Sequence, residues 1–169
     1  MLRGSALTIV DGADGPAAFL LGGASRLAGT IHAAQDVRIQ GNDFTSTTGV
    51  TADSDLIVDG RLTLRSANNT FQSRLNMNGN TLRVGATGRL SVEAGSGGDR
   101  FIFGSIENDG VVDVGFLLNL PTAAATYTNR GDWNVAATLP VTGAGARFEL
   151  QAGTLDVTGF LHVDNGSAR

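Results

Sequence analysis

The phrase Gly88-Arg89-Leu90-Ser91-Val92 decides the fold, because three later phrases repeat its order of glycine, any residue, apolar, polar and valine. The later copies are Gly110-Val111-Val112-Asp113-Val114, Gly131-Asp132-Trp133-Asn134-Val135 and Gly153-Thr154-Leu155-Asp156-Val157. Their closing valines follow one another at intervals of 22, 21 and 22 residues. A repeat of this period indicates a supersecondary unit that cannot bury its apolar side alone and has to stack on its neighbours.

Short runs in which apolar and polar residues alternate lie between the glycines, as is typical of β-strands. From Leu82 onward two or three such runs fall within each period. This matches one coil of a parallel β-helix, whose strands pair with their equivalents one coil above and below. The sequence therefore predicts an all-β fold, a single-stranded parallel β-helix (solenoid) of about 21–22 residues per coil.

Other β-architectures fit the spacing less well. An antiparallel β-sandwich also has strands about every 8–12 residues, but it does not produce a repeat of this period. A leucine-rich repeat needs a Leu-x-x-Leu-x-Leu phrase, and a left-handed hexapeptide helix needs an apolar residue at every sixth position. Neither pattern occurs in the chain. The antiparallel β-sandwich remains the alternative.

The N-terminal part of the chain is the least regular. We predict that residues 1–28 form an irregular cap or lead-in and that residues 29–169 form the coils of a single domain. Pro16 to Leu21, closed by Gly22-Gly23, is expected to be a short helix, because proline suits the first turn and glycine the position past the end. Such a segment would cover the open end of the stacked sheets.

Composition excludes several classes of function. The 169 residues carry 12 basic and 16 acidic side chains, a net charge of −4, which argues against a nucleic-acid partner. The absence of cysteine removes disulfides, thiolate catalysis and cysteine-bound zinc. No apolar run approaches the ~20 residues of a membrane span, so membrane insertion is not expected. The first residues do not have the apolar region of a secretion signal.

Stacking of the coils would place equivalent residues in rows along the axis. The apolar residues and valines of the four phrases would point inward, and the residue between them outward. The outward row consists of Ser91, Asp113, Asn134 and Asp156, spaced about 4.8 Å apart. Such a row could hold cations or sugar hydroxyls, but a solvated face that alternates charged and neutral side chains has the same composition.

The candidate binding residues are Trp133, Asp113, Asn134 and Asp156. Trp133 is the only tryptophan, and it either packs in the core or faces a groove in which its ring would stack on a sugar. Asp113 and Asp156 lie two coils apart, roughly 10 Å, without an acid between them, which is a poor catalytic pair. No catalytic residue, metal site or cofactor is predicted.

Gly79-Asn80-Thr81-Leu82-Arg83-Val84-Gly85-Ala86-Thr87-Gly88, continued by the first repeat phrase, resembles the strand repeats of bacterial autotransporter passengers and filamentous adhesins. Ser66-Ala67-Asn68-Asn69-Thr70-Phe71 is similar to the Ala-Asn-Thr-Tyr phrase of the autotransporter-associated repeat, with an additional asparagine and with phenylalanine for tyrosine. The resemblance covers residues 55–165. It implies an exported right-handed β-helix that acts as a stalk or adhesive surface without a cofactor, and it brings no catalytic residues.

We therefore expect a non-enzymatic structural or adhesive β-solenoid, located outside the cell or on a bacterial surface. The alternative is a carbohydrate-binding or carbohydrate-active β-helix, such as that of a phage tail fibre. Because the pattern still runs at Asn165-Gly166-Ser167-Ala168-Arg169 without an evident cap, we expect a longer repeat protein or self-association through the uncapped end. A host or glycan surface is the other expected partner.

Overall fold

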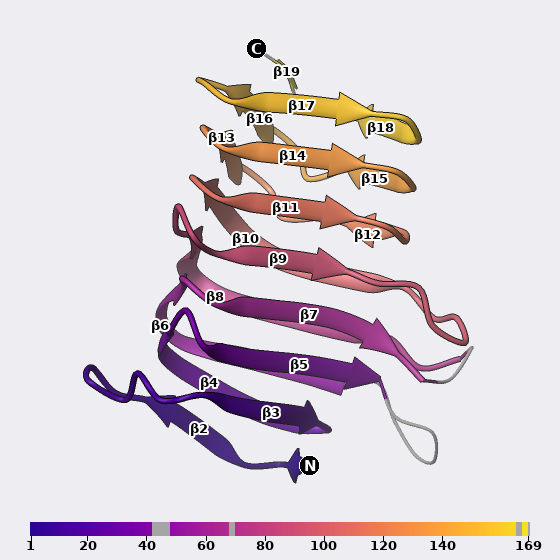
Figure 1. Ribbon diagram of the computed structural model, residues 1–169. Helices are drawn as coiled ribbons and strands as arrows, with labels where there is room; N and C mark the ends of the chain where they lie inside the picture. The colour runs from indigo at the N-terminus through magenta and orange to yellow at the C-terminus, as the bar shows by residue number, and fades with distance from the viewer. Residues whose placement is uncertain (42–47, 68–69, 165–166, 169) are drawn as a thin grey trace.

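The computed structural model describes residues 1–41, 48–67, 70–164 and 167–168, and within them every regular element is a β-strand. Each pairing between these strands is parallel. The chain winds through about seven stacked coils, with its two termini at opposite ends of the stack (Figure 1). The parallel β-helix is confirmed, and the antiparallel β-sandwich is wrong.

Two long sheets and one short sheet form the walls of the solenoid. The first sheet has eight strands in the order β1 (Leu2–Arg3), β3 (Ala17–Gly22), β5 (Gln35–Gly41), β7 (Arg61–Ser66), β9 (Arg89–Val92), β11 (Val111–Val114), β14 (Asp132–Val135) and β17 (Thr154–Val157). The second sheet has nine, namely β19 (Ser167–Ala168), β16 (Arg147–Leu150), β13 (Thr126–Asn129), β10 (Arg100–Asn108), β8 (Ser73–Val84), β6 (Thr48–Val58), β4 (Ala24–Ile31) and β2 (Ala6–Ile9), with β12 (Leu118–Asn119) beside β10. The short sheet pairs β15 (Thr138–Val141) with β18 (Phe160–Val163).

The register of the first sheet is the one that the repeat predicts. Val114 pairs with Val92 on one side and with Val135 on the other, and Val135 pairs with Val157. The same row continues toward the N-terminus through Leu64, Ile39, Leu21 and Leu2. One inward row therefore runs through every coil, including coils in which no repeat is visible in the sequence.

The coils differ in length although their inward rows match. The row advances by 18 residues from Leu21 to Ile39 but by 28 residues from Leu64 to Val92. Strands of the second sheet absorb part of this difference, since the shorter interval contains β4 with eight residues and the longer one contains β8 with 12. The first sheet keeps a constant register while the second sheet and its connections vary.

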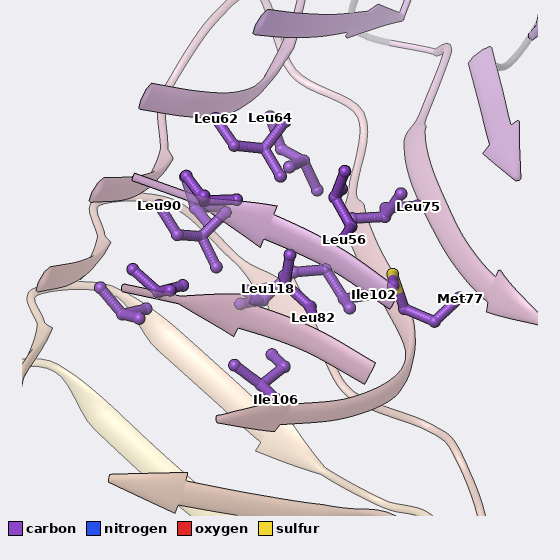
Figure 2. Close-up of a cluster of buried hydrophobic side chains, with 14 of the residues drawn as sticks. Leu56, Leu62, Leu64, Leu75, Met77, Leu82, Leu90, Ile102, Ile106 and Leu118 are labelled. Carbon is purple, nitrogen blue, oxygen red and sulfur yellow. The ribbon is translucent and has the colours of Figure 1, made fainter. Parts of the chain in front are cut away.

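Aliphatic side chains from the two sheets fill the interior. Leu62 and Leu90 on the first sheet and Leu56, Leu82 and Ile106 on the second are all fully buried, and they lie in one cluster (Figure 2). Burial of a side chain of this size stabilises the fold by about 1.5–3 kcal/mol. Each coil adds such residues from both walls, so the core is a continuous column along the axis.

A polar pair interrupts this column in the second sheet. The row that carries Val58 and Val84 continues with Asn108 and Asn129, both fully buried. The Asn108 side-chain amide donates to Asn129 Oδ1 over 2.7 Å, and the Asn129 amide donates to the Thr154 carbonyl oxygen over 2.7 Å. Because both amides have partners, the buried polar pair links three successive coils rather than weakening the core.

The glycines that open the repeat phrases are required by the closeness of the coils. Gly110 and Gly131 do not have a positive φ, so turn geometry alone does not demand glycine there. A Cβ on Gly131 would lie only 2.2 Å from the Gly110 carbonyl oxygen, and one on Gly110 only 2.2 Å from that of Gly85. The backbone N–H of Asp132 donates to the Gly110 oxygen over 2.8 Å. These glycines form a column along which one backbone rests directly on the next.

The N-terminal segment differs from its prediction. The expected helix from Pro16 to Leu21 is wrong, because Ala17–Gly22 is strand β3 and pairs with both β1 and β5. Leu21 is fully buried in the inward row of the first sheet. Residues 1–28 therefore contain paired strands that begin the solenoid. Asn68 and Asn69 of the adhesin-like phrase, and Asn165 and Gly166 near the C-terminus, lie outside the described residues.

Candidate ligand-binding surfaces

The predicted polar row lies on the first sheet in the expected register. Asp113 pairs with Ser91 and with Asn134, and Asn134 pairs with Asp156. The Asn134 amide donates to Asp113 Oδ1 over 2.9 Å, and Arg89 forms an ion pair with the other Asp113 oxygen at 2.6 Å. The carboxylate of Asp113 thus contacts the coils on both sides. This part of the row links coils to one another, whereas Asp156 in β17 is exposed.

Ser91 is buried, although its place in the row predicts an outward side chain. Its exposed fraction is only 4%. Arg61, which pairs with the residue two positions before Ser91, forms an ion pair at 2.6 Å with Glu93, two positions after it. The long Arg61 side chain must therefore cross above the row. The outer face of this sheet is covered by its own ion pairs at this point.

Trp133 lies in the core. Its side chain is fully buried, and its ring packs edge-on against Phe148 at a centroid distance of 4.9 Å and an angle of 64°. The indole N–H has no hydrogen-bond partner among the described residues. Of the two roles considered for Trp133, the structure shows packing, and the ring is not accessible for stacking on a sugar.

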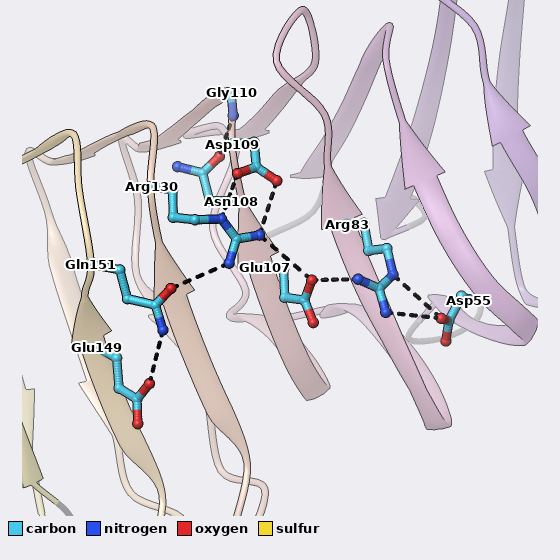
Figure 3. A network of polar contacts seen from close by, with 9 residues as sticks. All are labelled: Asp55, Arg83, Glu107, Asn108, Asp109, Gly110, Arg130, Glu149 and Gln151. Atoms are coloured by element: carbon cyan, nitrogen blue, oxygen red, sulfur yellow. Dashed lines mark hydrogen bonds and ion pairs between the residues drawn. The ribbon is translucent and has the colours of Figure 1, made fainter.

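A network of charged side chains runs along the outside of the second sheet (Figure 3). Arg83 bonds to Asp55 at 3.4 Å and to Glu107, and Arg130 contacts Glu107 at 3.7 Å and Asp109 at 2.6 Å. The hydrogen bond from Arg130 holds the pKa of Asp109 below its usual value, and the hydrogen bond from the Thr81 backbone N–H does the same for the pKa of Asp55. Each of these exposed ion pairs contributes at most about 1 kcal/mol to the stability of the fold.

The lowered pKa keeps Asp55 and Asp109 ionised, whereas a general acid needs a raised pKa. The described residues also include no group of three or more His, Asp or Glu side chains that could hold a metal ion. The network ties strands of successive coils together.

A hollowed surface lies on the outer side of the second sheet, where β6, β8 and β10 run side by side. One hollow of about 270 Å³ is lined by Gly49, Thr51 and Arg74, and an adjoining one of about 210 Å³ by Asn80, Ser105 and Thr122. Asn76 and Phe103 line both. We call this surface the second-sheet groove, and we define it by Gly49, Thr51, Arg74, Asn76, Asn80 and Phe103.

Strand register assembles the groove from three coils. Gly49 pairs with Arg74 and Arg74 with Phe101, while the row beside it carries Thr51, Asn76 and Phe103. The rings of Phe101 and Phe103 are nearly parallel, 9° apart, at a centroid distance of 5.8 Å, and the Arg74 guanidinium lies 5.3 Å from the Phe101 ring. The groove is open at Gly49, because a Cβ there would meet nothing within 4 Å.

The buried Arg100 is a structural residue. It has no exposed surface, and its guanidinium donates to the carbonyl oxygens of Glu93 at 2.8 Å, Gly97 at 2.9 Å and Gly98 while lying 4.4 Å from the Phe116 ring. Burial lowers the pKa of Arg100 to about 10. Because backbone oxygens occupy the guanidinium, this cation fixes the connection between β9 and β10 and does not face a ligand.

The sequence contains one signal for the groove, although no groove was predicted from it. Arg100 to Phe103 is predicted as a strand, and Ile102 occupies its inward position. Alternation then places Phe101 and Phe103 on the outer face, where polar residues are the rule. Two phenylalanines on a solvent side indicate an exposed aromatic surface. Which residues surround that surface depends on long-range pairing, which the sequence pattern does not reveal.

The part of the chain that the structure describes contains no helix long and apolar enough to cross a lipid bilayer. Comparisons of the chain with protein-family models, with curated proteins and with solved structures find no match in any of the three. The fold alone therefore classifies the chain, as a parallel β-solenoid with about 22 residues per coil.

Proposed function

We propose that the chain is a structural or adhesive β-solenoid, a rigid length of an exported surface protein of the bacterial autotransporter or filamentous-adhesin type. The observation that carries the proposal is the single inward row that keeps its register from Leu2 to Val157. Each coil contacts only its neighbours, so such a stack extends by adding coils and presents long side faces. Stalks and adhesive surfaces need both properties.

The state of the acidic side chains supports a non-enzymatic role. Asp55 and Asp109 each contact an arginine from a neighbouring coil, and hydrogen bonds hold the pKa of both side chains below its usual value. Both carboxylates therefore remain ionised at neutral pH, whereas one of the two acids of a glycosidase has to be protonated. Release of reducing or unsaturated sugar from any polysaccharide by the purified chain would contradict this part of the proposal.

Self-association through the C-terminal coil is part of the same proposal. Val157 at the end of β17 is 40% exposed, whereas Val114 and Val135, which occupy the same row in earlier coils, are buried. Each of those two valines is covered by the coil that follows it. A second copy that stacks on β17 would cover Val157 in the same way. Sedimentation velocity should show oligomers of the chain that Val157→Asp reduces, and a monomer over the whole concentration range would contradict stacking.

Surface exposure is tested on cells of the source organism. Antibodies raised against the purified chain should label intact cells, because an exported solenoid is accessible from outside. Labelling that appears only after the cells are permeabilised would exclude the surface role. An antibody against a cytoplasmic protein, applied to the same cells, controls for leakage.

A carbohydrate-binding β-helix is the second candidate, and the second-sheet groove favours it. Trp133 does not contribute, because it is buried in the core. The groove instead supplies Phe103 as an accessible ring, together with the amides of Asn76 and Asn80. An adhesive surface and a glycan-binding groove are compatible functions of one solenoid.

A further inference from the structure

We propose that the second-sheet groove binds an oligosaccharide that carries carboxylate groups, such as a chain of uronic acid units. The proposal rests on the adhesive role for its biological setting, since it supplies that role with a ligand. Binding is measured on the purified chain, however, so that a failure to bind is distinguishable from a failure to reach the cell surface. Four properties of the groove support it, namely its shape, its aromatic surface, its hydrogen-bonding groups and its charge.

The shape of the groove suits a linear polymer. Its two hollows adjoin at Asn76 and Phe103 and cross β6, β8 and β10, so they extend along the solenoid axis. Successive coils are about 4.8 Å apart, and a pyranose unit in an extended chain advances by roughly 5 Å. Successive sugars would therefore meet equivalent positions on successive coils.

Phe103 provides the apolar contact. Its ring is partly exposed between the two hollows and is held parallel to the ring of Phe101. A pyranose ring has one face of C–H groups, and such a face packs well on a flat aromatic surface. Binding sites in general combine an apolar wall of this kind with a few convergent polar groups.

Two amide side chains provide polar groups of opposite kinds. Asn76 Oδ1 accepts a hydrogen bond of 2.9 Å from the Asn78 backbone N–H, and its side-chain NH₂ has no partner among the described residues. The Asn80 NH₂ donates to the Ala52 carbonyl oxygen over 3.4 Å, which leaves Asn80 Oδ1 free to accept. A sugar hydroxyl both donates and accepts, so one donor and one acceptor side by side can bind the hydroxyls of a sugar ring.

Arg74 supplies the charge that selects a carboxylate. Most outward arginines of the solenoid contact an acid, as Arg26 contacts Asp53 and Arg89 contacts Asp113. Arg74 instead donates to Gln72 Oε1, a neutral acceptor, at 2.8 Å, and it forms no ion pair within the described residues. An arginine without a carboxylate partner, at the end of an aromatic groove, favours a ligand that brings one. A single cation on a chain of net charge −4 does not suit a nucleic acid.

Calorimetric titration with defined hexasaccharides tests the proposal. Hexagalacturonate and hexamannuronate are the acidic probes, maltohexaose and cellohexaose are the neutral ones, and a thymidine hexanucleotide represents nucleic acid. An acidic hexasaccharide should bind at least about tenfold more tightly than the neutral ones, since its carboxylate meets Arg74. Absence of binding by both acidic probes at about 5 mM, equal binding of the neutral probes, or tighter binding of the oligonucleotide would each overturn the proposal.

A variant that adds bulk locates the site without removing any contact. Gly49→Val places a side chain in open space inside the groove, and valine suits the strand β6. It should weaken binding of the acidic probe by at least about tenfold with an unchanged unfolding transition. Gly15→Val is the matched control, because a Cβ at Gly15 also meets nothing within 4 Å and lies outside the groove. Arg74→Gln should remove the preference for acidic over neutral probes. Unchanged binding by Gly49→Val would show that the groove is not the site.

Discussion

Replacement of Gly131 by alanine tests the claim that the coils stack on a column of glycines. The new Cβ would lie 2.2 Å from the carbonyl oxygen of Gly110, 2.7 Å from the carbonyl carbon of Asp109 and 2.8 Å from the nitrogen of Gly110. All three are backbone atoms, so no side chain can rotate away to relieve the overlap. The two coils must therefore separate locally before the methyl group fits.

Two costs follow from this separation. Overpacking of a close contact costs about 1–3 kcal/mol. The movement also weakens the hydrogen bond of 2.8 Å from the Asp132 N–H to the Gly110 oxygen, which is worth about 1 kcal/mol. Alanine has fewer backbone conformations than glycine in the unfolded chain, and this offsets the loss of stability by roughly 0.4–1 kcal/mol. We expect Gly131→Ala to lower the free energy of unfolding by about 2–3 kcal/mol.

Urea unfolding followed by the fluorescence of Trp133 measures this change, because the single tryptophan is buried in the folded chain. Gly49→Ala is the matched control. Its Cβ meets nothing within 4 Å and its φ is not positive, so alanine there should leave the chain unchanged or stabilise it by up to about 1 kcal/mol. Equal unfolding midpoints for the two variants would refute the stacking argument.

Three other substitutions probe the polar contacts. Asn129→Ala should lower the free energy of unfolding by about 1–3 kcal/mol, because the buried Asn108 amide loses one of its two acceptors and the Thr154 carbonyl oxygen loses a donor; an unchanged urea midpoint would contradict this. Arg100→Lys should destabilise the chain by about 1–2 kcal/mol, since an ammonium group cannot reach the same backbone oxygens, and hydrogen exchange should accelerate at residues 93–99; unchanged exchange would show that the guanidinium does not hold this connection. Asp109 has a lowered pKa, so its contribution is complete above the unfolded pKa of about 4 and is lost as the pH falls through the folded value. When the pH is lowered from about 4 to about 2, the melting temperature of Asp109→Asn should therefore fall less than that of the wild type. An identical pH dependence would show that the contact with Arg130 contributes nothing to stability.

The C-terminal half of the fold is predictable because identical residues repeat in it. Val92, Val114, Val135 and Val157 occupy equivalent places, and their even spacing along the chain is enough to predict how they pair. In the N-terminal half the residues of the same row are leucine and isoleucine at uneven intervals, so no period can be counted. The row is continuous in space but not regular in sequence.

Local signals were misleading at two strands. Pro16 and the pair Gly22-Gly23 are typical helix boundaries, yet pairing of β3 with β1 and β5 outweighs this local preference. Thr138–Val141 was not predicted as a strand, and it contains Pro140. Proline lacks an N–H but keeps its carbonyl, and the Pro140 oxygen accepts a bond of 2.9 Å from the Leu120 N–H. Pairing between distant segments decides both cases.

The groove could not be predicted from the sequence for a related reason. Gly49 is an ordinary glycine in a polar stretch, and Arg74 is one of several scattered arginines. Their significance comes from strand register, which places Gly49 next to Arg74 and Arg74 next to Phe101. An unbulged strand or another coil length would bring different side chains together. A candidate site on a solenoid therefore depends more on residues that pair between adjacent coils than on residues that are adjacent in the sequence.

The unequal coil lengths have a practical consequence for engineering. Since the wall built from β3 to β17 tolerates coils of 18 as well as 28 residues, the solenoid should accept foreign peptides where its natural insertions occur. An epitope or a short peptide tag grafted at the register shift of β8, between Asn76 and Thr81, would project sideways from the rod at a fixed height along its axis. Several such grafts on different coils would be separated by a known number of coils and therefore by a known distance along the axis.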